Sequence, residues 1–425
     1  MSNNDNHQLT SWIEVAKDSD FPIQNLPYGI AKLSDGAMVA VTRIGDHLID
    51  LAALERLGYF LPTQFHLSGK FRQPTLNSFI EMGKETHSAV RRRLSDIFRH
   101  DNPELRDKQG LRRIVVIPVS EAQLLMPVKV TDYTDFYSSI EHATNVGKMF
   151  RDPANALLPN WRHLPVGYHG RASSIVVSGT GIHRPNGQTL PAGADKPVFG
   201  PTKMFDFELE MAFVTGKSTE LGDSIKASEA EDYIFGFLLF NDLSARDIQS
   251  WEYVPLGPFL SKNFGSVVSP WIVTLDALEP FRVQGPEQDP EVLPYLKTDG
   301  LRNFDINLEV IIKPENGEEN LVCQSNFRYM YWNICQQLAH HTVNGCNITV
   351  GDLYASGTIS GSEPGSYGSM LELTWRGANP IQLNDGTERK FINDNDTMII
   401  RGFCKNNELR IGFGECVTNV LPAKE

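Results

Sequence analysis

The stretch from Phe205 to Phe213 constrains the fold of this chain most strongly, because large apolar residues at every second position alternate with three acids. The apolar positions are Phe205, Phe207, Leu209, Met211 and Phe213, and the acidic positions are Asp206, Glu208 and Glu210. This period of two predicts a β-strand with one apolar face. Glu208 and Glu210 then project from the same face, about 7 Å apart along the strand. That face is either a solvated acidic surface or half of a ligand site.

The rest of the chain also favours β-structure. With 34 Gly and 25 Pro among 425 residues, it is rich in turns, and it is longer than one typical domain. We predict an N-terminal domain over residues 1–118 and a large β-rich domain over residues 119–425, with the boundary in the Ser120–Pro127 segment. The net charge of −13 argues against a nucleic-acid-binding surface.

Local patterns predict a few elements in each domain. In the first domain, a lead-in anchored by Trp12 and Ile13 is followed by a β-meander over residues 21–51. A helix is expected over Asn77–His100, and its arginine triplet Arg91–Arg93 is expected to face solvent. A strand is expected over Leu111–Val119. In the second domain, the expected elements are a helix over Ser325–Thr342 and a hairpin of Thr397–Cys404 with Leu409–Phe413.

The cysteines and the N-terminus predict an intracellular protein. The five cysteines form no CxxC pair, and an odd number of them is typical of reduced thiols in a reducing compartment. The first residues have neither a basic start nor an apolar core, so no signal peptide is expected. The apolar run Tyr233–Phe240 is too short to span a membrane. We therefore predict a soluble cytoplasmic protein.

Two further acids are candidate partners for Glu208 and Glu210. Asp135 lies in the segment DYTDFY, and Asp242 follows the apolar run Tyr233–Phe240. If the four carboxylates converge, each like-charged pair at 4 Å costs about 4 kcal/mol at an effective dielectric constant near 20. They therefore either lie apart or hold a cation. Carboxylates without Cys or His select a hard ion, Ca²⁺ or Mg²⁺.

His142 is the best candidate for a general base, although a structural, hydrogen-bonded histidine remains the alternative. Glu372 lies in SMLELTW, where alternation places it opposite Leu371 and Leu373. It either orients a histidine or is a surface acid. Other catalytic motifs are missing from the sequence: GTISG is not a nucleophile elbow, GTG lacks the spacing of a dinucleotide-binding loop, and no Walker-type loop occurs.

At this point several blocks resemble the fumarylacetoacetase family. They are DFYSS from Asp135, HATNVG from His142, LPNW from Leu158, LPVGYHGRASS from Leu164, NDLSARDIQ from Asn241, WEYVPLGPFL from Trp251, SGTISG from Ser356, GSMLEL from Gly368 and RIGFG from Arg410. The resemblance extends over essentially the whole chain. It implies a mostly β fold, with a small SH3-like β-barrel followed by a large β-sandwich-roll domain, and a homodimer.

The resemblance also implies an activity. Family members hydrolyse a carbon–carbon bond of 4-fumarylacetoacetate to give fumarate and acetoacetate, the last step of tyrosine and phenylalanine catabolism. By motif, Asp135, Glu208, Glu210 and Asp242 are expected to bind a divalent ion, Ca²⁺ or Mg²⁺. A second, Mg²⁺-type site would use Asp242, Lys262 and Ser266. The expected substrate contacts are Tyr137, Arg151, Tyr168, Gln249, Tyr253 and Thr358.

These residues suggest a mechanism. His142, oriented by Glu372, would activate a water molecule for attack on the carbonyl attached to the fumaroyl group. The metal ion, with Lys262 and Gln249, would stabilise the developing negative charge. Two positions depart from the family pattern, Ile140-Glu141 before His142 and Ser266 in place of a threonine. Two rival functions remain. The first is another enzyme on the same scaffold, such as an acylpyruvate hydrolase, a decarboxylase or a hydratase. The second is a non-catalytic Ca²⁺-binding or scaffold protein.

Overall fold

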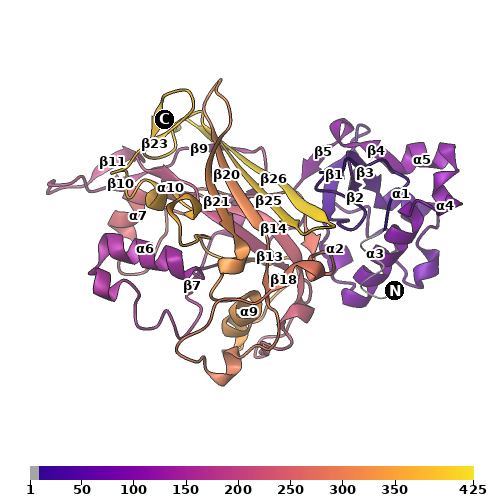
Figure 1. Ribbon diagram of the computed structural model, residues 1–425, viewed down its shortest axis with the longest axis horizontal. Helices are drawn as coiled ribbons and strands as arrows, with labels where there is room; N and C mark the ends of the chain where they lie inside the picture. Colours follow the sequence, from indigo (N-terminus) through magenta and orange to yellow (C-terminus); the bar gives the residue numbers. More distant parts are fainter. Residues whose placement is uncertain (1–8) are drawn as a thin grey trace.

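The computed structural model describes residues 9–425, so the first eight residues of the predicted lead-in lie outside the described part. Figure 1 shows a small N-terminal unit beside a larger unit built on two β-sheets. Trp12 and Ile13 anchor the lead-in as predicted, because the Trp12 indole donates to the Ile97 carbonyl and Ile13 is buried. Among the described residues, no helix is both long and apolar enough to cross a membrane.

The small unit is an antiparallel sheet covered by helices. Its strands, in spatial order β4-β3-β2-β1-β5, are β4 (Val116–Pro118), β3 (His47–Asp50), β2 (Met38–Ile44), β1 (Tyr28–Lys32) and β5 (Gln123–Leu125). Its helices are α1 (Leu51–Arg56), α2 (Asn77–Ile80), α3 (Lys84–Phe98), α4 (Pro103–Arg106) and α5 (Gln109–Val115). The predicted meander is confirmed. The domain boundary near residue 118 stays a prediction, and β5 lies beyond it. The resemblance of this unit to an SH3 barrel also stays a prediction.

Three predictions for this unit are wrong in detail. The helix expected over Asn77–His100 is two helices, because Gly83 takes a φ of 84° between them. Arg91 does not face solvent; its buried guanidinium donates to the carbonyls of Gln24 and Asn25. The strand expected over Leu111–Val119 is helical up to Val115, and only Val116–Pro118 is extended, since tertiary packing overrides the β-branched run.

The large unit contains two stacked sheets. The first has the spatial order β7-β6-β22-β13-β14-β16-β8, with β17 also paired to β14. Its strands are β6 (Tyr133–Phe136), β7 (Gly167–His169), β8 (Ile175–Val177), β13 (Leu209–Thr215), β14 (Ile234–Asp242), β16 (Ser266–Val268), β17 (Val273–Thr274) and β22 (Leu353–Ala355). The second, in the order β21-β20-β25-β26-β9, contains β21 (Asn320–Asn326), β20 (Asn307–Lys313), β25 (Thr397–Lys405), β26 (Arg410–Leu421) and β9 (Gly181–His183).

Shorter elements surround these sheets. The two-stranded pairs are β10 (Asn186–Thr189) with β11 (Val198–Pro201), β12 (Phe205–Asp206) with β15 (Ser244–Ala245), β18 (Arg282–Val283) with β19 (Asn303–Phe304), and β23 (Ile381–Gln382) with β24 (Glu388–Arg389). The helices are α6 (Ile140–Phe150), α7 (Arg246–Glu252), α8 (Leu275–Leu278), α9 (Ile334–Thr342) and α10 (Met370–Leu373). The mostly β fold with its curled central sheet is therefore confirmed (Figure 1).

The central sheet is buried on both faces. On β13, Met211 and Phe213 pack into the core shared with the second sheet, whereas Ala212 and Val214 pack into the core shared with the small unit. Alternate side chains on a strand point to opposite faces, so Glu210 lies on the same face as Ala212. The acidic face of the predicted strand therefore faces the protein interior.

The strand predicted over Phe205–Phe213 is interrupted. Phe205 and Asp206 pair with β15, and β13 begins only at Leu209, with Glu208 in an isolated bridge to Ser369.

Elsewhere, the helix expected over Ser325–Thr342 begins at Ile334, where Asn333 forms a capping box with Gln336. Glu372 lies on the short helix α10 and not on an extended segment. The predicted C-terminal hairpin is confirmed as β25 and β26.

Candidate active site

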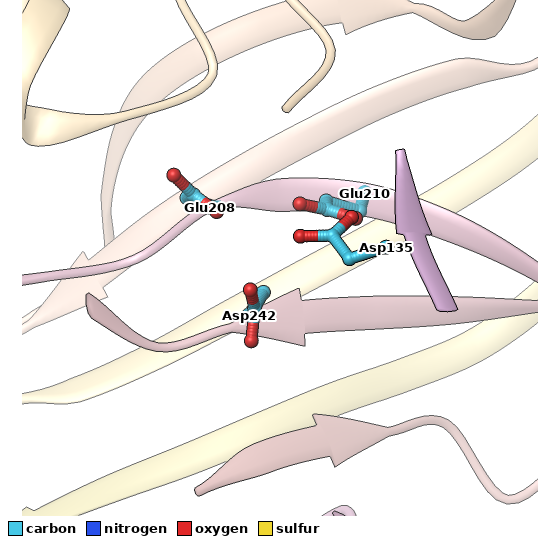
Figure 2. A group of neighbouring side chains, drawn as sticks. All are labelled: Asp135, Glu208, Glu210 and Asp242. Atoms are coloured by element: carbon cyan, nitrogen blue, oxygen red, sulfur yellow. The ribbon is translucent and has the colours of Figure 1, made fainter. Parts of the chain in front are cut away.

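Four carboxylates meet at the end of the central sheet. Asp135 comes from β6, Glu208 and Glu210 from the two sides of the start of β13, and Asp242 from the last position of β14 (Figure 2). One carboxylate oxygen of each lies within 4.8 Å of one of every other, and all four side chains are buried. The sheet register explains the meeting, because Leu209 pairs with Asn241 and Ala355 pairs with Asp135. The predicted convergence of these acids is therefore seen in the structure.

Two buried cations offset part of this negative charge. The Lys262 ammonium donates to Glu208 and, at 2.8 Å, to Asp242. Arg246 Nη2 lies 2.9 Å from Glu208 Oε1, and its Nε donates to Asp206 at 2.7 Å. Burial acts against the ammonium, but the attraction of Asp242 and Glu208 outweighs it and raises the pKa of Lys262. Lys262 is therefore a fixed positive charge beside the acids.

The ionisation of the acids is uneven. Burial raises the pKa of Glu208, but the attraction of Lys262 and Arg246 outweighs burial and lowers that pKa to about 2. Burial and the repulsion of Asp242 raise the pKa of Asp135 well above its usual value. Burial and the repulsion of Asp135 raise the pKa of Glu210 in the same way. The side of the cluster formed by Asp135 and Glu210 therefore lacks compensating positive charge.

The side of the cluster formed by Asp135 and Glu210 is suited to bind a metal ion. Asp135 Oδ1 and Glu210 Oε1 are buried and have no hydrogen-bond partner among the described residues, although buried carboxylate oxygens are normally paired. The donor set consists of carboxylate oxygens alone, which suits a hard divalent cation. The buried acidic group can therefore bind a metal ion.

His142 and Glu372 form a buried pair next to this cluster. His142 lies on α6, whose N-cap Ser139 accepts from the His142 amide, and its Nδ1 lies 2.7 Å from Glu372 Oε2. Burial raises the pKa of Glu372, but His142 and the hydrogen bonds from Asn145 and Ser369 outweigh burial and lower it. The carboxylate is therefore ionised and accepts the Nδ1 proton, which leaves the Nε2 lone pair of His142 to take a proton.

The predicted substrate contacts divide into two groups. Tyr137, Tyr168 and Thr358 are at the site. The Tyr137 ring lies 5.2 Å from that of His142, the Tyr168 hydroxyl donates to Asp242 at 3.3 Å, and the Thr358 hydroxyl is buried without a partner among the described residues. Thr358 follows Gly357, whose amide donates to Glu210. Tyr168 therefore contacts the carboxylates directly, Thr358 follows a residue that does, and Tyr137 lies beside His142.

The other three predicted contacts make no hydrogen bond to the four carboxylates within the described part of the chain. Gln249 Oε1 accepts from Arg246, which turns the amide nitrogen of Gln249 away from Arg246. Arg151 is exposed and donates to the Ala156 carbonyl, and Tyr253 is 51% exposed at the end of α7. The predicted substrate roles of all six residues stay predictions.

The second metal site predicted at Asp242, Lys262 and Ser266 also stays a prediction. Ser266 Oγ donates to Asp242 Oδ1 at 2.8 Å, so the three residues do lie together. The Lys262 ammonium, however, carries no lone pair for a metal ion. In the structure it acts as a hydrogen-bond donor to the two carboxylates.

Sequence reasoning did not identify several residues that hold the site together. Arg246 links Asp206, Glu208 and Gln249, and Ser360 Oγ donates to both oxygens of Glu372. Both lie in the blocks NDLSARDIQ and SGTISG that carry the resemblance, but a single buried arginine or serine has no spacing signal of its own. Only the fold shows that their partners lie nearby.

Comparisons with known proteins show the family of this chain. The chain matches the family model described as fumarylacetoacetase N-terminal over residues 24–127 and that described as fumarylacetoacetate (FAA) hydrolase C-terminal over residues 132–421. It is 53% identical to the fumarylacetoacetase of Homo sapiens over 97% of this chain and 99% of that one. It is 51% identical to the fumarylacetoacetase of Arabidopsis thaliana over 98% of this chain and 99% of that one.

A solved structure shares the fold. The fumarylacetoacetate hydrolase from psychrophilic Exiguobacterium antarcticum matches with a TM-score of 0.52 and 17% sequence identity, over 94% of this chain and 100% of that chain. At that identity the likeness concerns the fold alone.

Proposed function

The chain belongs to the fumarylacetoacetase family, and from this premise we propose that it is the hydrolase that cleaves 4-fumarylacetoacetate to fumarate and acetoacetate, in tyrosine and phenylalanine catabolism. The observation that carries the proposal is the buried His142–Glu372 pair next to a group of four buried carboxylates. A β-diketone needs an activated water molecule and a place for negative charge, and these two features meet both needs.

The side chains suggest the order of the proton transfers and bond changes. His142 Nε2 takes a proton from water, and the water oxygen bonds to the carbonyl carbon attached to the fumaroyl group. Collapse of the tetrahedral intermediate breaks the bond to the neighbouring methylene carbon, whose electron pair leaves with acetoacetate as an enolate. Protonation of that carbon completes the products. Glu372 holds the imidazole in the required tautomer throughout.

Lys262 and Gln249 suit the stabilisation of the oxyanion. Two hydrogens of the Lys262 ammonium are used by Glu208 and Asp242, which leaves the third for a substrate oxygen. The Gln249 amide nitrogen is oriented by the contact of its oxygen with Arg246. Each donor to an oxyanion is worth about 3–4 kcal/mol of transition-state stabilisation in comparable enzymes.

We propose Ca²⁺ or Mg²⁺ as the ion that Asp135, Glu208, Glu210 and Asp242 hold. A bound ion would orient the two diketone oxygens and offset negative charge. The support is the all-carboxylate donor set with its two unpartnered oxygens. Elemental analysis of the purified protein should find a divalent ion, and the double variant Glu208→Gln, Glu210→Gln should lose it. Full metal content in that variant would contradict this assignment.

Turnover tests the activity directly. The absorbance band of fumarylacetoacetate should disappear when the protein is added with Mg²⁺ or Ca²⁺, and should persist after chelation. His142→Ala should slow the reaction far more than tenfold. Acylpyruvates serve as the comparison, because the rival enzymes of this scaffold act on them. Faster turnover of an acylpyruvate than of fumarylacetoacetate would favour the rival function.

We also propose a homodimer in the cytoplasm. All five cysteines are free thiols, as expected in a reducing compartment. Large apolar side chains are exposed after α7, with Val254 at 66% and Leu256 at 97% exposure. The β10–β11 hairpin adds Phe199, and Trp251 donates to Gln188 of β10, which links the two segments. Exposed apolar patches of this kind mark protein–protein contacts.

The oligomeric state tests this surface. Leu256→Asp should convert the dimer to a monomer in sedimentation velocity. Leu61→Asp is the matched control, because Leu61 is also highly exposed but lies on the small unit. A wild-type protein that sediments as a monomer would contradict the dimer, and a Leu256→Asp dimer would move the interface elsewhere.

A further inference from the structure

A cavity of about 350 Å³ lies beside the carboxylate cluster, on the side of Asp242 and Lys262. Tyr168 and Ser266 of the proposed site line it as well. Its remaining wall is formed by residues that have no role in the reaction described above. They include Tyr133, Gly170, Arg171, Ser173 and Asn263.

Arg171 brings a positive charge to this wall. Its Nε donates to Ser173 Oγ at 2.8 Å, whereas its two terminal nitrogens have no partner among the described residues. Arg171 follows β7, whose Tyr168 pairs with Asp135 in the sheet. The backbone at Gly170 lies directly on the Tyr133 ring, where a Cβ would come within 2.2 Å of a ring carbon. The start of the loop that carries Arg171 is therefore held against the sheet.

The cavity offers hydrogen-bond donors to an anion. The Tyr133 hydroxyl is buried, in a residue only 4% exposed, and has no partner among the described residues. The Asn263 side-chain amide also lacks a partner within that part of the chain. Asp242 is the one carboxylate among the lining residues, and its two oxygens already accept from Lys262, Tyr168 and Ser266. A carboxylate that enters here therefore meets a free guanidinium and uncommitted neutral donors.

We propose that this cavity is a carboxylate subsite, in which the Arg171 guanidinium binds one of the two terminal carboxylates of the substrate. The inference rests on the proposed function, because fumarylacetoacetate carries a carboxylate at each end. The planar fork of arginine binds a carboxylate through two parallel hydrogen bonds. Arg151, one of the predicted substrate contacts, lies at the end of α6 and is not part of the cavity wall, so Arg171 is a separate positive group.

Substrate analogues with one carboxylate test the subsite. Arg171→Gln should raise KM for fumarylacetoacetate at least about tenfold, because a hydrogen-bonded charge pair is lost, and should change kcat less than threefold. Of two analogues, fumarylacetone and crotonoylacetoacetate, each lacks one of the carboxylates. For one of them, KM should be the same in wild type and Arg171→Gln. Arg171→Lys keeps the charge but not the planar fork of the guanidinium. Its KM for fumarylacetoacetate should therefore lie between those of the wild type and Arg171→Gln.

The controls separate this inference from the proposed function. Arg92→Gln makes the same charge change at an exposed position of α3 and should leave KM unchanged. Calorimetric binding of fumarylacetoacetate to His142→Ala, with and without Arg171→Gln, measures the subsite without turnover. Absent turnover in the wild type would overturn the proposed function, whereas equal affinity in these two variants would overturn the subsite. A change of oligomeric state in Arg171→Gln with unchanged affinity would make Arg171 an interface residue and would also overturn it.

Discussion

Asp206 shows how one acid of an acidic strand can support the site without joining the cluster of four carboxylates. It is fully buried, accepts from Arg246 Nε, and accepts from the backbone amides of Met370 and Leu371. It therefore joins Arg246 to the first turn of α10, the helix that carries Glu372. The carboxylate cluster and the His142–Glu372 pair are connected through this acid and Arg246.

Replacing Arg246 should destabilise the protein. Arg246→Met leaves Asp206 buried without its counter-charge and leaves Glu208 with Lys262 alone. Breaking such a buried pair costs about 3–5 kcal/mol of unfolding free energy. Urea unfolding followed by circular dichroism measures the loss. Arg92→Met, on an exposed part of α3, should leave the midpoint close to that of the wild type. Equal midpoints for the two variants would show that the ion pairs contribute no net stability.

Glu372→Gln should impair catalysis without removing the metal ion. The neutral amide cannot stabilise a protonated His142, so kcat should fall by about 10²–10⁴-fold, the range that general acid–base catalysis contributes. Stopped-flow turnover and elemental analysis give the two readouts. Glu363→Gln, at an exposed position of the preceding loop, is the control. Loss of the metal ion together with activity would instead assign Glu372 a role in the metal site.

At the scale of elements, the position of α6 depends on one close backbone contact. Gly147 of α6 lies so near the Ala156 carbonyl that a Cβ would come within 2.0 Å of its oxygen. The same helix carries His142 about one and a half turns earlier, and Arg151 is its C-cap. A side chain at position 147 would therefore push apart the helix and the segment that follows it.

A matched pair of glycine substitutions tests this contact. Gly147→Ala should lower both the unfolding free energy and kcat, because α6 must shift and move His142 away from Glu372. Gly110→Ala is made in α5, where a Cβ meets no atom within 4 Å, and should raise stability by up to about 1 kcal/mol. Thermal unfolding and turnover are measured for both. A fully active Gly147→Ala would show that the segment after α6 yields without moving the helix.

At the scale of the whole molecule, the small unit and the central sheet share one core. Tyr28 of β1 exchanges backbone hydrogen bonds with Ile272, and the ring of His87 on α3 lies 4.8 Å from the Phe235 ring of β14. His87 Nε2 donates to the carbonyls of Phe79 and Ile80 at the end of α2. Burial lowers the pKa of His87 to about 4. This histidine is therefore neutral in the folded protein.

The contact between the units should weaken in acid. The unfolded chain protonates His87 near pH 6.5, whereas the folded protein resists protonation until about pH 4. Stability from this residue is therefore present above pH 6.5 and is lost as the pH falls toward 4, by about 2 kcal/mol between pH 7.5 and 5. Urea unfolding is measured at both pH values for the wild type and for His87→Gln, whose side chain does not titrate. Between pH 7.5 and 5, the unfolding free energy of the variant should fall by about 2 kcal/mol less than that of the wild type. An identical pH dependence in both proteins would contradict the assignment.

The sequence by itself determined which acidic and basic side chains are candidates for the site. The alternation around Glu208 and Glu210 placed both on one face, and the quoted blocks pointed to Asp135, Asp242, His142 and Glu372 as their neighbours. These inferences succeed because strand periodicity is local and because a family's motifs carry its reactive groups. The mostly β fold followed from the same sources, since turn residues and short alternating runs are local signals.

Only the tertiary structure decided which polar groups meet. It interrupted the strand between Asp206 and Leu209, turned Asp206 toward Arg246, and placed the partners of Glu372 on three separate segments. It also buried Arg91 and brought Arg171 to a cavity beside Lys262. The physical reason is that a buried charge is stabilised by whichever partners lie nearby in space, and no local pattern of residues encodes contacts between segments far apart in the chain.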